Sequence, residues 1–226
     1  MIPWKLLDRA VVPGGGGDLT LHQRGDEFSI RVDGIELMNS RVYAKEDALS
    51  KIGCARIAER KHARVLIGGL GMGFSLATAL AGLRDDAEVV VAELVPSVVE
   101  WNRARLGHLV GHPLRDARVT LRQEDVARVL RERSAAYDAI LLDVDNGPDG
   151  LTRGSNDWLY TPAGLACAHA ALRAKGILGV WSARPDDAFV RRMRAARFTV
   201  DEIVVTSRGG RKGAQHVLWL GARQGD

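Results

Sequence analysis

From residue 63 onward, short apolar runs alternate with segments whose apolar residues recur at helical spacing. Short runs rich in β-branched residues predict strands, and a period of about 3.6 residues predicts helices. Strands are predicted at residues 64–67, 88–92, 118–121, 137–142, 176–181, 200–205 and 216–220. Helices are predicted at residues 74–83, from Pro96, and at 126–133, 163–173 and 186–196. Strands separated by helices form a parallel sheet, and the last two, joined without a helix, add one antiparallel strand. The pattern predicts an α/β fold with a doubly wound, mostly parallel seven-stranded sheet.

The first sixty residues follow a different pattern. Residues 18–24 and 27–32 alternate polar and apolar positions with period two, and Gly25 and Asp26 between them suit a tight turn. Pro13 and the following four glycines predict a flexible connection, and residues 45–60 have helical spacing. We therefore expect a small N-terminal antiparallel β lobe with a linking helix at residues 1–60, and a ligand-binding domain at 61–226.

Composition excludes several classes of protein. Of the 226 residues, 46% are hydrophobic and 27% charged, which is typical of a globular chain. The net charge of +4 is too small to indicate a nucleic-acid partner. Cys54 and Cys167 have no CxxC or Cys/His spacing, so we expect neither a metal site nor a disulfide scaffold. The chain shows no signal-peptide core and no apolar run of about 18 residues, which predicts a cytoplasmic protein with no membrane partner.

Candidate binding residues follow the predicted strands, where ligands of open α/β sheets collect. After the first strand comes a turn that contains Gly69, Gly71 and Gly73, which suits close approach of the backbone to a ligand. Such a turn is also a packing device. Glu93 follows the second strand, 20 residues after Gly73. An acid there can accept both hydroxyls of a ribose, or can merely favour the N-terminus of the next helix.

Two further acids follow the next strands. Asp125 can accept from the exocyclic amine of a base, or can cap the helix that begins at Val126. Asp143 ends an apolar strand, where an unpaired carboxylate is costly, and this favours a functional role. Asp145 and Asp149 lie in a loop rich in Asp, Asn and Gly, where ordinary turn chemistry is the alternative.

The glycine spacing selects a class of nucleotide. The turn reads GxGxG, whereas dinucleotide folds carry GxGxxG, and the chain has no P-loop motif. A phosphate would also prefer nearby cations, and no Lys or Arg occurs from the glycine turn up to Arg84. These features indicate a nucleoside with an amino-acid-derived tail, for which S-adenosylmethionine or a close relative is the best candidate.

At these residues the chain resembles the spermidine synthase family of aminopropyltransferases, which share the Rossmann-like class I methyltransferase fold. The similar segments run through most of the chain: VDG at 32–34, VLIGGLGMG at 65–73, AELVP at 92–96, EDV at 124–126, YDAILLD at 137–143, LYT at 159–161 and GIL at 176–178. The resemblance implies that Glu93 binds the ribose, that Asp125 binds the adenine amine, and that Asp143 faces the acceptor. Leu94 and Val126, which follow the two acids, join the expected binding set.

The part that would bind the acceptor departs from the family. Leu37 stands where the family has a glutamine, and Glu46 and Asp47 lie near its Tyr-His-Glu cluster. Asn146 replaces the second aspartate after the fourth strand, although Asp145 is adjacent, and Gly71 replaces an aspartate that attracts the aminopropyl ammonium. Without that aspartate, backbone amides can receive a carboxylate, so we expect intact S-adenosylmethionine to be accepted.

Three functions follow from these observations. The first is methyl transfer to a small-molecule acceptor such as an amine by in-line displacement, with Asp143 and Asp145 orienting or deprotonating the acceptor. The second is aminopropyl transfer to a polyamine from decarboxylated S-adenosylmethionine. The third is a non-catalytic nucleoside-binding dimer, and a homodimer is expected in any case. Trp158, Tyr160 and Trp181 are candidate acceptor walls, with core packing as the alternative.

Overall fold

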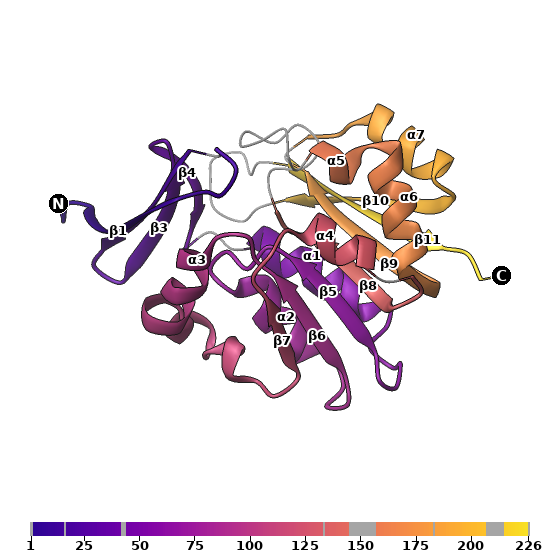
Figure 1. Ribbon diagram of the computed structural model, residues 1–226, viewed down its shortest axis with the longest axis horizontal. Coiled ribbons are helices and arrows are strands. Elements are labelled where there is room, and N and C mark those ends of the chain that lie inside the picture. Colours follow the sequence, from indigo (N-terminus) through magenta and orange to yellow (C-terminus); the bar gives the residue numbers. More distant parts are fainter. Residues whose placement is uncertain are drawn as a thin grey trace.

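The computed structural model describes residues 2–15, 17–41, 44–132, 134–144, 157–182, 184–206 and 215–225. These residues form a seven-stranded sheet with helices on both faces and a four-stranded antiparallel sheet from the N-terminal part of the chain (Figure 1). Within the described ranges, every helix is too short or too polar to cross a lipid bilayer.

The large sheet confirms the predicted α/β architecture. Its strands, in chain order, are β5 (Arg64–Gly68), β6 (Glu88–Ala92), β7 (Val119–Arg122), β8 (Tyr137–Leu142), β9 (Leu172–Ser182), β10 (Phe198–Thr206) and β11 (Gln215–Arg223). In space they follow the order β10-β11-β9-β8-β5-β6-β7. All neighbouring pairs are parallel except those of β11, which runs antiparallel to both β9 and β10. The final hairpin thus adds one antiparallel strand, and that strand lies inside the sheet.

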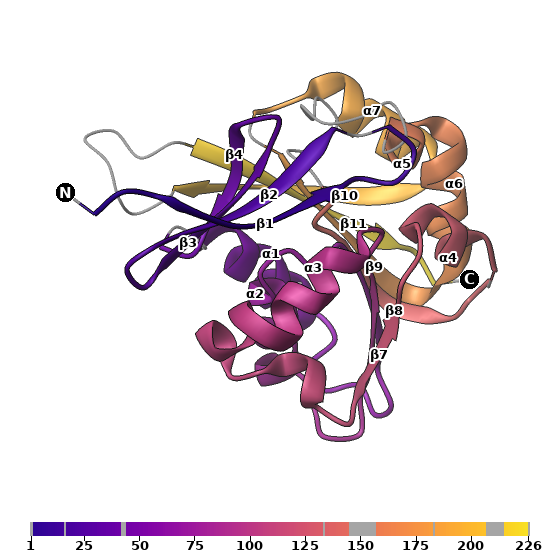
Figure 2. The same ribbon diagram turned by 60° about the vertical axis from the view of Figure 1, so that its left-hand side comes forward.

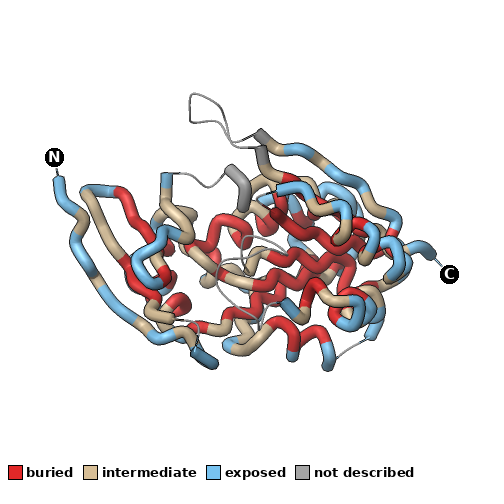
Figure 3. The backbone as a smooth tube through the Cα atoms, turned by 90° about the horizontal axis from the view of Figure 1, so that it is seen from above, coloured by how far each residue is buried: buried red, intermediate tan, exposed pale blue. Residues whose placement is uncertain are grey.

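The strand sequences bury both faces of this sheet, as a parallel sheet requires. Alternate residues of β5 belong to two hydrophobic clusters: Val65 and Ile67 to one, and Leu66 to the other. The first cluster includes residues of α1 (Ala44–Ala55), α2 (Phe74–Gly82) and α3 (Pro96–Trp101). The second includes residues of α4 (Val126–Glu132), α5 (Asp157–Tyr160), α6 (Pro162–Ala171) and α7 (Asp187–Ala195). Figure 3 shows the buried residues concentrated in these strands.

Local signals fix where the helices begin. Pro96 and Pro162 occupy first-turn positions of α3 and α6, where the missing N–H costs nothing. Thr161 caps α6, since its Oγ1 accepts from the amide of Gly164 at 3.1 Å, and Asp186 caps α7 by accepting from the amide of Phe189 at 2.9 Å. The predicted helices therefore begin close to where the sequence placed them.

The N-terminal sheet is larger than the sequence predicted. Its strands are β1 (Lys5–Val11), β2 (Asp18–Arg24), β3 (Glu27–Val32) and β4 (Ile35–Asn39), paired in that order. Only β2 and β3 were predicted. The predicted connection after Pro13 falls between β1 and β2, which pair as a hairpin, and the Val12 amide donates to the Gly17 carbonyl at 3.1 Å beside it. Asp33 and Gly34 have positive φ, which suits a tight hairpin turn between β3 and β4.

The small sheet packs beside α3 (Figures 1 and 2). The indole N–H of Trp101 donates to Asp8 Oδ2 at 2.7 Å, and the rings of Phe28 and His108 meet edge to face at 5.8 Å. Helix α1 packs closely on the large sheet at Gly53. A Cβ at this position would lie 2.6 Å from Leu141 Cδ2 of β8, so the contact requires glycine. The division of the chain near residue 60 stays a prediction.

Candidate functional site

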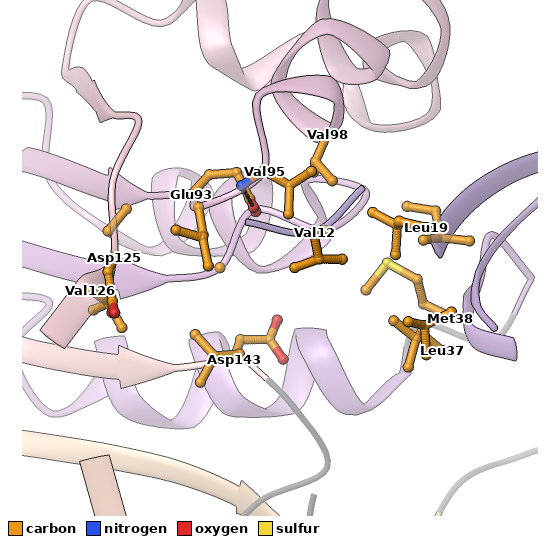
Figure 4. A pocket seen from close by; sticks show the side chains of 17 residues that line it. Val12, Leu19, Leu37, Met38, Glu93, Val95, Val98, Asp125, Val126 and Asp143 are labelled. Carbon is orange, nitrogen blue, oxygen red and sulfur yellow. Dashed lines mark hydrogen bonds between the residues drawn. The ribbon is translucent and has the colours of Figure 1, made fainter. Parts of the chain in front are cut away.

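A cavity lies beyond the carboxyl ends of β5, β6 and β8, with the small sheet on its far side (Figure 4). It contains about 910 Å³ of empty space, part of which is open to solvent. This is the edge where an open α/β sheet binds its ligands, because the strand ends and the helix starts leave backbone groups available there. Of the residues expected to bind a nucleoside, Gly69, Gly71, Glu93, Leu94, Asp125, Val126 and Asp143 all line it.

The glycine turn after β5 forms one wall and needs glycine for steric reasons. Gly69 has a φ of +89°, and a Cβ there would lie 2.5 Å from the carbonyl oxygen of Asp143. Gly71 has a φ of +51°, and a Cβ there would lie 2.6 Å from Met38 Cε. Gly73 faces elsewhere: it is not among the described residues that line the cavity, and its nearest side-chain neighbour is Asn102. The sequence expectation that Gly73 contacts the ligand is therefore not supported by its position.

Glu93 is only 7% exposed and is held by backbone amides. Its Oε2 accepts from the amide of Leu70 at 2.9 Å and its Oε1 from the amide of Val95 at 2.7 Å. Burial raises the pKa of Glu93, and hydrogen bonds from the amides of Val95, Leu70, Gly71 and Leu94 oppose that rise. The carboxylate thus ties the glycine turn after β5 to the loop after β6.

Asp125 caps a helix and also lines the cavity, while its expected contact with the base stays a prediction. Its Oδ1 accepts from the Ala127 amide at 2.8 Å and its carbonyl accepts from the Arg128 amide at 2.9 Å, so it caps α4. The residue is nevertheless half-buried and lines the cavity beside Val126. Capping fixes the position of the carboxylate without removing it from the cavity.

Asp143 directly follows β8, and a serine holds its side chain. The Asp143 amide donates to the Gly68 carbonyl at 2.9 Å, which continues the pairing of β5 and β8. Its Oδ2 accepts from Ser75 Oγ at 2.6 Å. Ser75 is 2% exposed and lies in the first turn of α2. Sequence reasoning missed Ser75, because a single serine in a helix of small residues carries no signal of its own.

The cavity is polar at one end and apolar at the other. Asp125 lies at one end, Glu93 and Asp143 lie on either side of the middle, and Leu19 and Met38 stand at the opposite end (Figure 4). The apolar end is lined by side chains from the N-terminal segment: Val12, Leu19, Ile30, Val32, Leu37 and Met38. The sequence indicated apolar faces on β2 and β3, but it did not place them in the site.

Several other candidates are not among the described residues that line this cavity. Tyr160 is buried in the second hydrophobic cluster and Trp181 in the first, so these two candidate acceptor walls are core residues. Trp158 is half-buried and packs against the second cluster. Asp47 accepts a hydrogen bond from Thr78 Oγ1 at 2.6 Å and is not among the described lining residues. Asp145 falls outside the described residues.

Asn146 and Asp149 also fall outside the described residues. Within the described ranges no cluster of three His, Cys, Asp or Glu residues is placed to hold a metal ion. Burial raises the pKa of the Cys54 thiol to about 12, so this thiol is protonated at neutral pH.

Comparison with known proteins identifies the fold. No protein-family model matches the sequence, and no curated protein matches it. The structure is similar to that of spermidine synthase from Thermotoga maritima, with a TM-score of 0.75 and 15% identity over 98% of this chain and 74% of that one. A spermidine synthase in complex with the transition-state analogue AdoDATO has the same score and identity over 98% and 73%. A probable spermidine synthase from Corynebacterium glutamicum has a TM-score of 0.61 and 15% identity over 96% and 79%. The chain therefore has a spermidine synthase-like fold, as the sequence resemblance predicted.

Proposed function

We propose that the protein is a transferase that takes an adenosyl sulfonium compound as donor and moves an aminopropyl group from it to an amine. The observation that carries this proposal is the meeting of Glu93, Asp125 and Asp143 with the glycine turn around one cavity. Three carboxylates at successive strand ends suit a ligand with an amine at one end, hydroxyls in the middle and positive charge beyond.

Each lining group has a place in binding the donor. Asp125 accepts from the exocyclic amine of the base, and Glu93 accepts from the ribose hydroxyls. Gly69 and Gly71 let the turn pack against Asp143 and Met38, since a Cβ at either position would collide with them, and the turn lines the cavity where the tail would lie. The negative charge of Asp143 attracts the sulfonium and the incoming amine.

The glycine turn favours the decarboxylated donor over intact S-adenosylmethionine. The sequence suggested that amides of this turn receive the carboxylate of the intact compound. In the structure four of these amides already have acceptors: Gly69 donates to the Ala92 carbonyl at 2.8 Å, Leu70 and Gly71 donate to Glu93, and Gly73 donates to the Leu70 carbonyl at 2.8 Å. A donor without a carboxylate needs no such partner. The spermidine synthase-like fold also supports aminopropyl transfer more than methyl transfer.

In the proposed reaction the protein aligns the amine with the donor carbon and supplies Asp143 as the base. The nitrogen lone pair of the amine forms a bond to the carbon beside the sulfonium as the carbon–sulfur bond breaks, and that bond's electron pair stays on sulfur as a neutral thioether. Asp143 accepts the proton that the nitrogen loses and releases it to solvent. Because Ser75 holds one oxygen of Asp143, the carboxylate meets the amine in a fixed orientation.

Methyl transfer is the second candidate, and Gly71 is the observation that favours it. The absence of a carboxylate at this position removes a repulsion that intact S-adenosylmethionine would otherwise meet. Incubation with each donor and a set of amines distinguishes the two reactions, since aminopropyl transfer yields methylthioadenosine and methyl transfer yields S-adenosylhomocysteine. Calorimetry with both donors measures binding alone. If neither donor binds at millimolar concentration, the transferase proposal is wrong.

The expected homodimer is a separate proposal. Sedimentation equilibrium of the full chain tests it, and a monomer at micromolar concentration would contradict it.

A further inference from the structure

The end of the cavity farthest from Asp125 is an apolar surface built by three strands of the small sheet. Leu19, Ile30 and Val32 of β2 and β3 are buried, and Leu37 and Met38 of β4 are half-buried beside them. Water in contact with such side chains is readily displaced by an apolar group, which gains burial in proportion to its area. This end of the cavity therefore favours an apolar occupant.

Met38 extends this surface to the glycine turn. Its methyl group lies so close to Gly71 that a Cβ on that residue would be 2.6 Å from it. The region between the donor tail and the small sheet is thus lined by a thioether side chain. Leu37 lies next to Met38 and lines the same cavity. A cationic group placed here would lose water and gain at most the weak acceptor of the Met38 sulfur.

Carboxylates among the described lining residues are unequally placed for an acceptor. Asp125 lies at the opposite end of the cavity and caps α4 (Figure 4). Both oxygens of Glu93 accept from backbone amides. Asp143 is the remaining described carboxylate, and it lies in the middle of the cavity, across from Glu93 (Figure 4). Among the described lining residues, one carboxylate thus remains for an acceptor next to the apolar end, which suits a single ammonium beside the reacting carbon.

We infer that the acceptor is a primary amine carried on an apolar body, such as an alkylamine or arylalkylamine, and not a diamine. This inference rests on the proposed function, because the amine is the nucleophile of the proposed transfer. Its nitrogen lies at Asp143, and its apolar body lies against Leu19, Leu37 and Met38. A diamine of equal length would place its second ammonium on these side chains, at the cost of its hydration.

Pentylamine and 1,4-diaminobutane provide a matched test, since they have the same length and differ in a terminal methyl or ammonium group. Binding of each amine is measured by calorimetry on the protein saturated with methylthioadenosine. Transfer is measured as release of methylthioadenosine from decarboxylated S-adenosylmethionine. We expect pentylamine to exceed 1,4-diaminobutane at least about tenfold in affinity and in kcat/KM, because burial of the second ammonium is unfavourable.

A pair of variants on β4 tests whether the apolar surface sets this preference. Leu37→Glu places a carboxylate at the apolar end and should shift the preference at least about tenfold toward the diamine. Ile35→Glu adds the same charge to the same strand at a position that is 55% exposed and does not line the cavity, so it should leave the ratio unchanged. The matched amines decide the question on the unmodified protein even if Leu37→Glu does not fold.

The outcomes separate the inference from the function on which it rests. Equal or better binding and transfer with 1,4-diaminobutane would overturn the inference and leave the transferase proposal standing. A shift of equal size in Leu37→Glu and Ile35→Glu would also overturn it, since the effect would then be general charge. Failure of methylthioadenosine and both donors to bind would overturn the proposed function, and the inference with it.

Discussion

Replacement of Glu93 by glutamine perturbs the carboxylate that we expect to hold the ribose. The substitution keeps the shape of the side chain but removes its charge and turns one acceptor into a donor. In the structure, one oxygen accepts from the Leu70 amide at 2.9 Å and the other from the Val95 amide at 2.7 Å. A glutamine can satisfy one of these amides, because its own NH2 group faces the other.

The expected magnitudes differ for stability and for binding. A buried amide left without an acceptor costs about 1–3 kcal/mol. Part of this cost is offset because the variant no longer buries a charge, so we expect a net loss of at most about 2 kcal/mol in the free energy of unfolding. Hydrogen bonds from hydroxyls to a charged acceptor contribute about 1.5–3 kcal/mol. Nucleoside affinity should therefore fall about tenfold to a hundredfold.

Calorimetric titration with methylthioadenosine measures this loss, and thermal unfolding shows that the variant is folded. The control is Glu88→Gln, at the other end of β6, where the side chain pairs with Arg64 at 3.1 Å away from the cavity. We expect the control to bind like the unmodified protein. A folded Glu93→Gln variant with affinity within about twofold of the unmodified protein would refute the assigned role, since even one lost charged hydrogen bond is worth more.

The pH dependence supplies an independent check. Burial raises the pKa of Glu93, so the contribution of this group to stability is fully present below its pKa in the unfolded chain and is lost as pH rises through the raised value. The affinity for the nucleoside has the opposite pH dependence, because the ionised carboxylate is the better hydrogen-bond acceptor. Affinity should decrease as pH falls through the raised pKa, and Glu93→Gln should lack this decrease. Identical pH profiles for the two proteins would contradict the assignment.

Three further predictions test other parts of the site. Ser75→Ala removes the 2.6 Å hydrogen bond to Asp143 and should lower kcat about tenfold, while donor affinity stays within about twofold of that of the unmodified protein. Ser75→Thr keeps a hydroxyl and should restore part of kcat, and single-turnover assays measure both variants. Gly69→Ala should lower the free energy of unfolding in urea by about 1–3 kcal/mol or more, because φ is +89° and the new Cβ would collide with the Asp143 carbonyl; an unchanged urea midpoint would contradict this. The hydrogen bond from Trp101 lowers the pKa of Asp8, so the stabilising effect of the ionised Asp8 should be present at neutral pH and lost as pH falls through the lowered pKa. Asp8→Asn should therefore lower the urea midpoint of unfolding at pH 7 but not in acid, as measured by tryptophan fluorescence.

Local periodicity predicted most of the fold, and its failures have physical causes. The strands of the large sheet were predicted because both of their faces are buried, which produces continuous apolar runs such as residues 137–142. Strand β1 was missed because it is largely exposed and shows no apolar alternation, and β4 is exposed at its start. The position of β11 between β9 and β10 depends on pairing with residues far away in the chain, which periodicity does not report.

The sequence by itself determined that Glu93, Asp125 and Asp143 follow successive strands of one parallel sheet, and this was enough to bring them to one edge. It determined this because strand direction and side-chain period are local properties of the backbone. Only the tertiary structure decided that backbone amides hold Glu93, that Ser75 holds Asp143, and that the small sheet closes the cavity with Leu37 and Met38. These contacts join residues that are distant in sequence, and the packing of the whole core fixes their geometry.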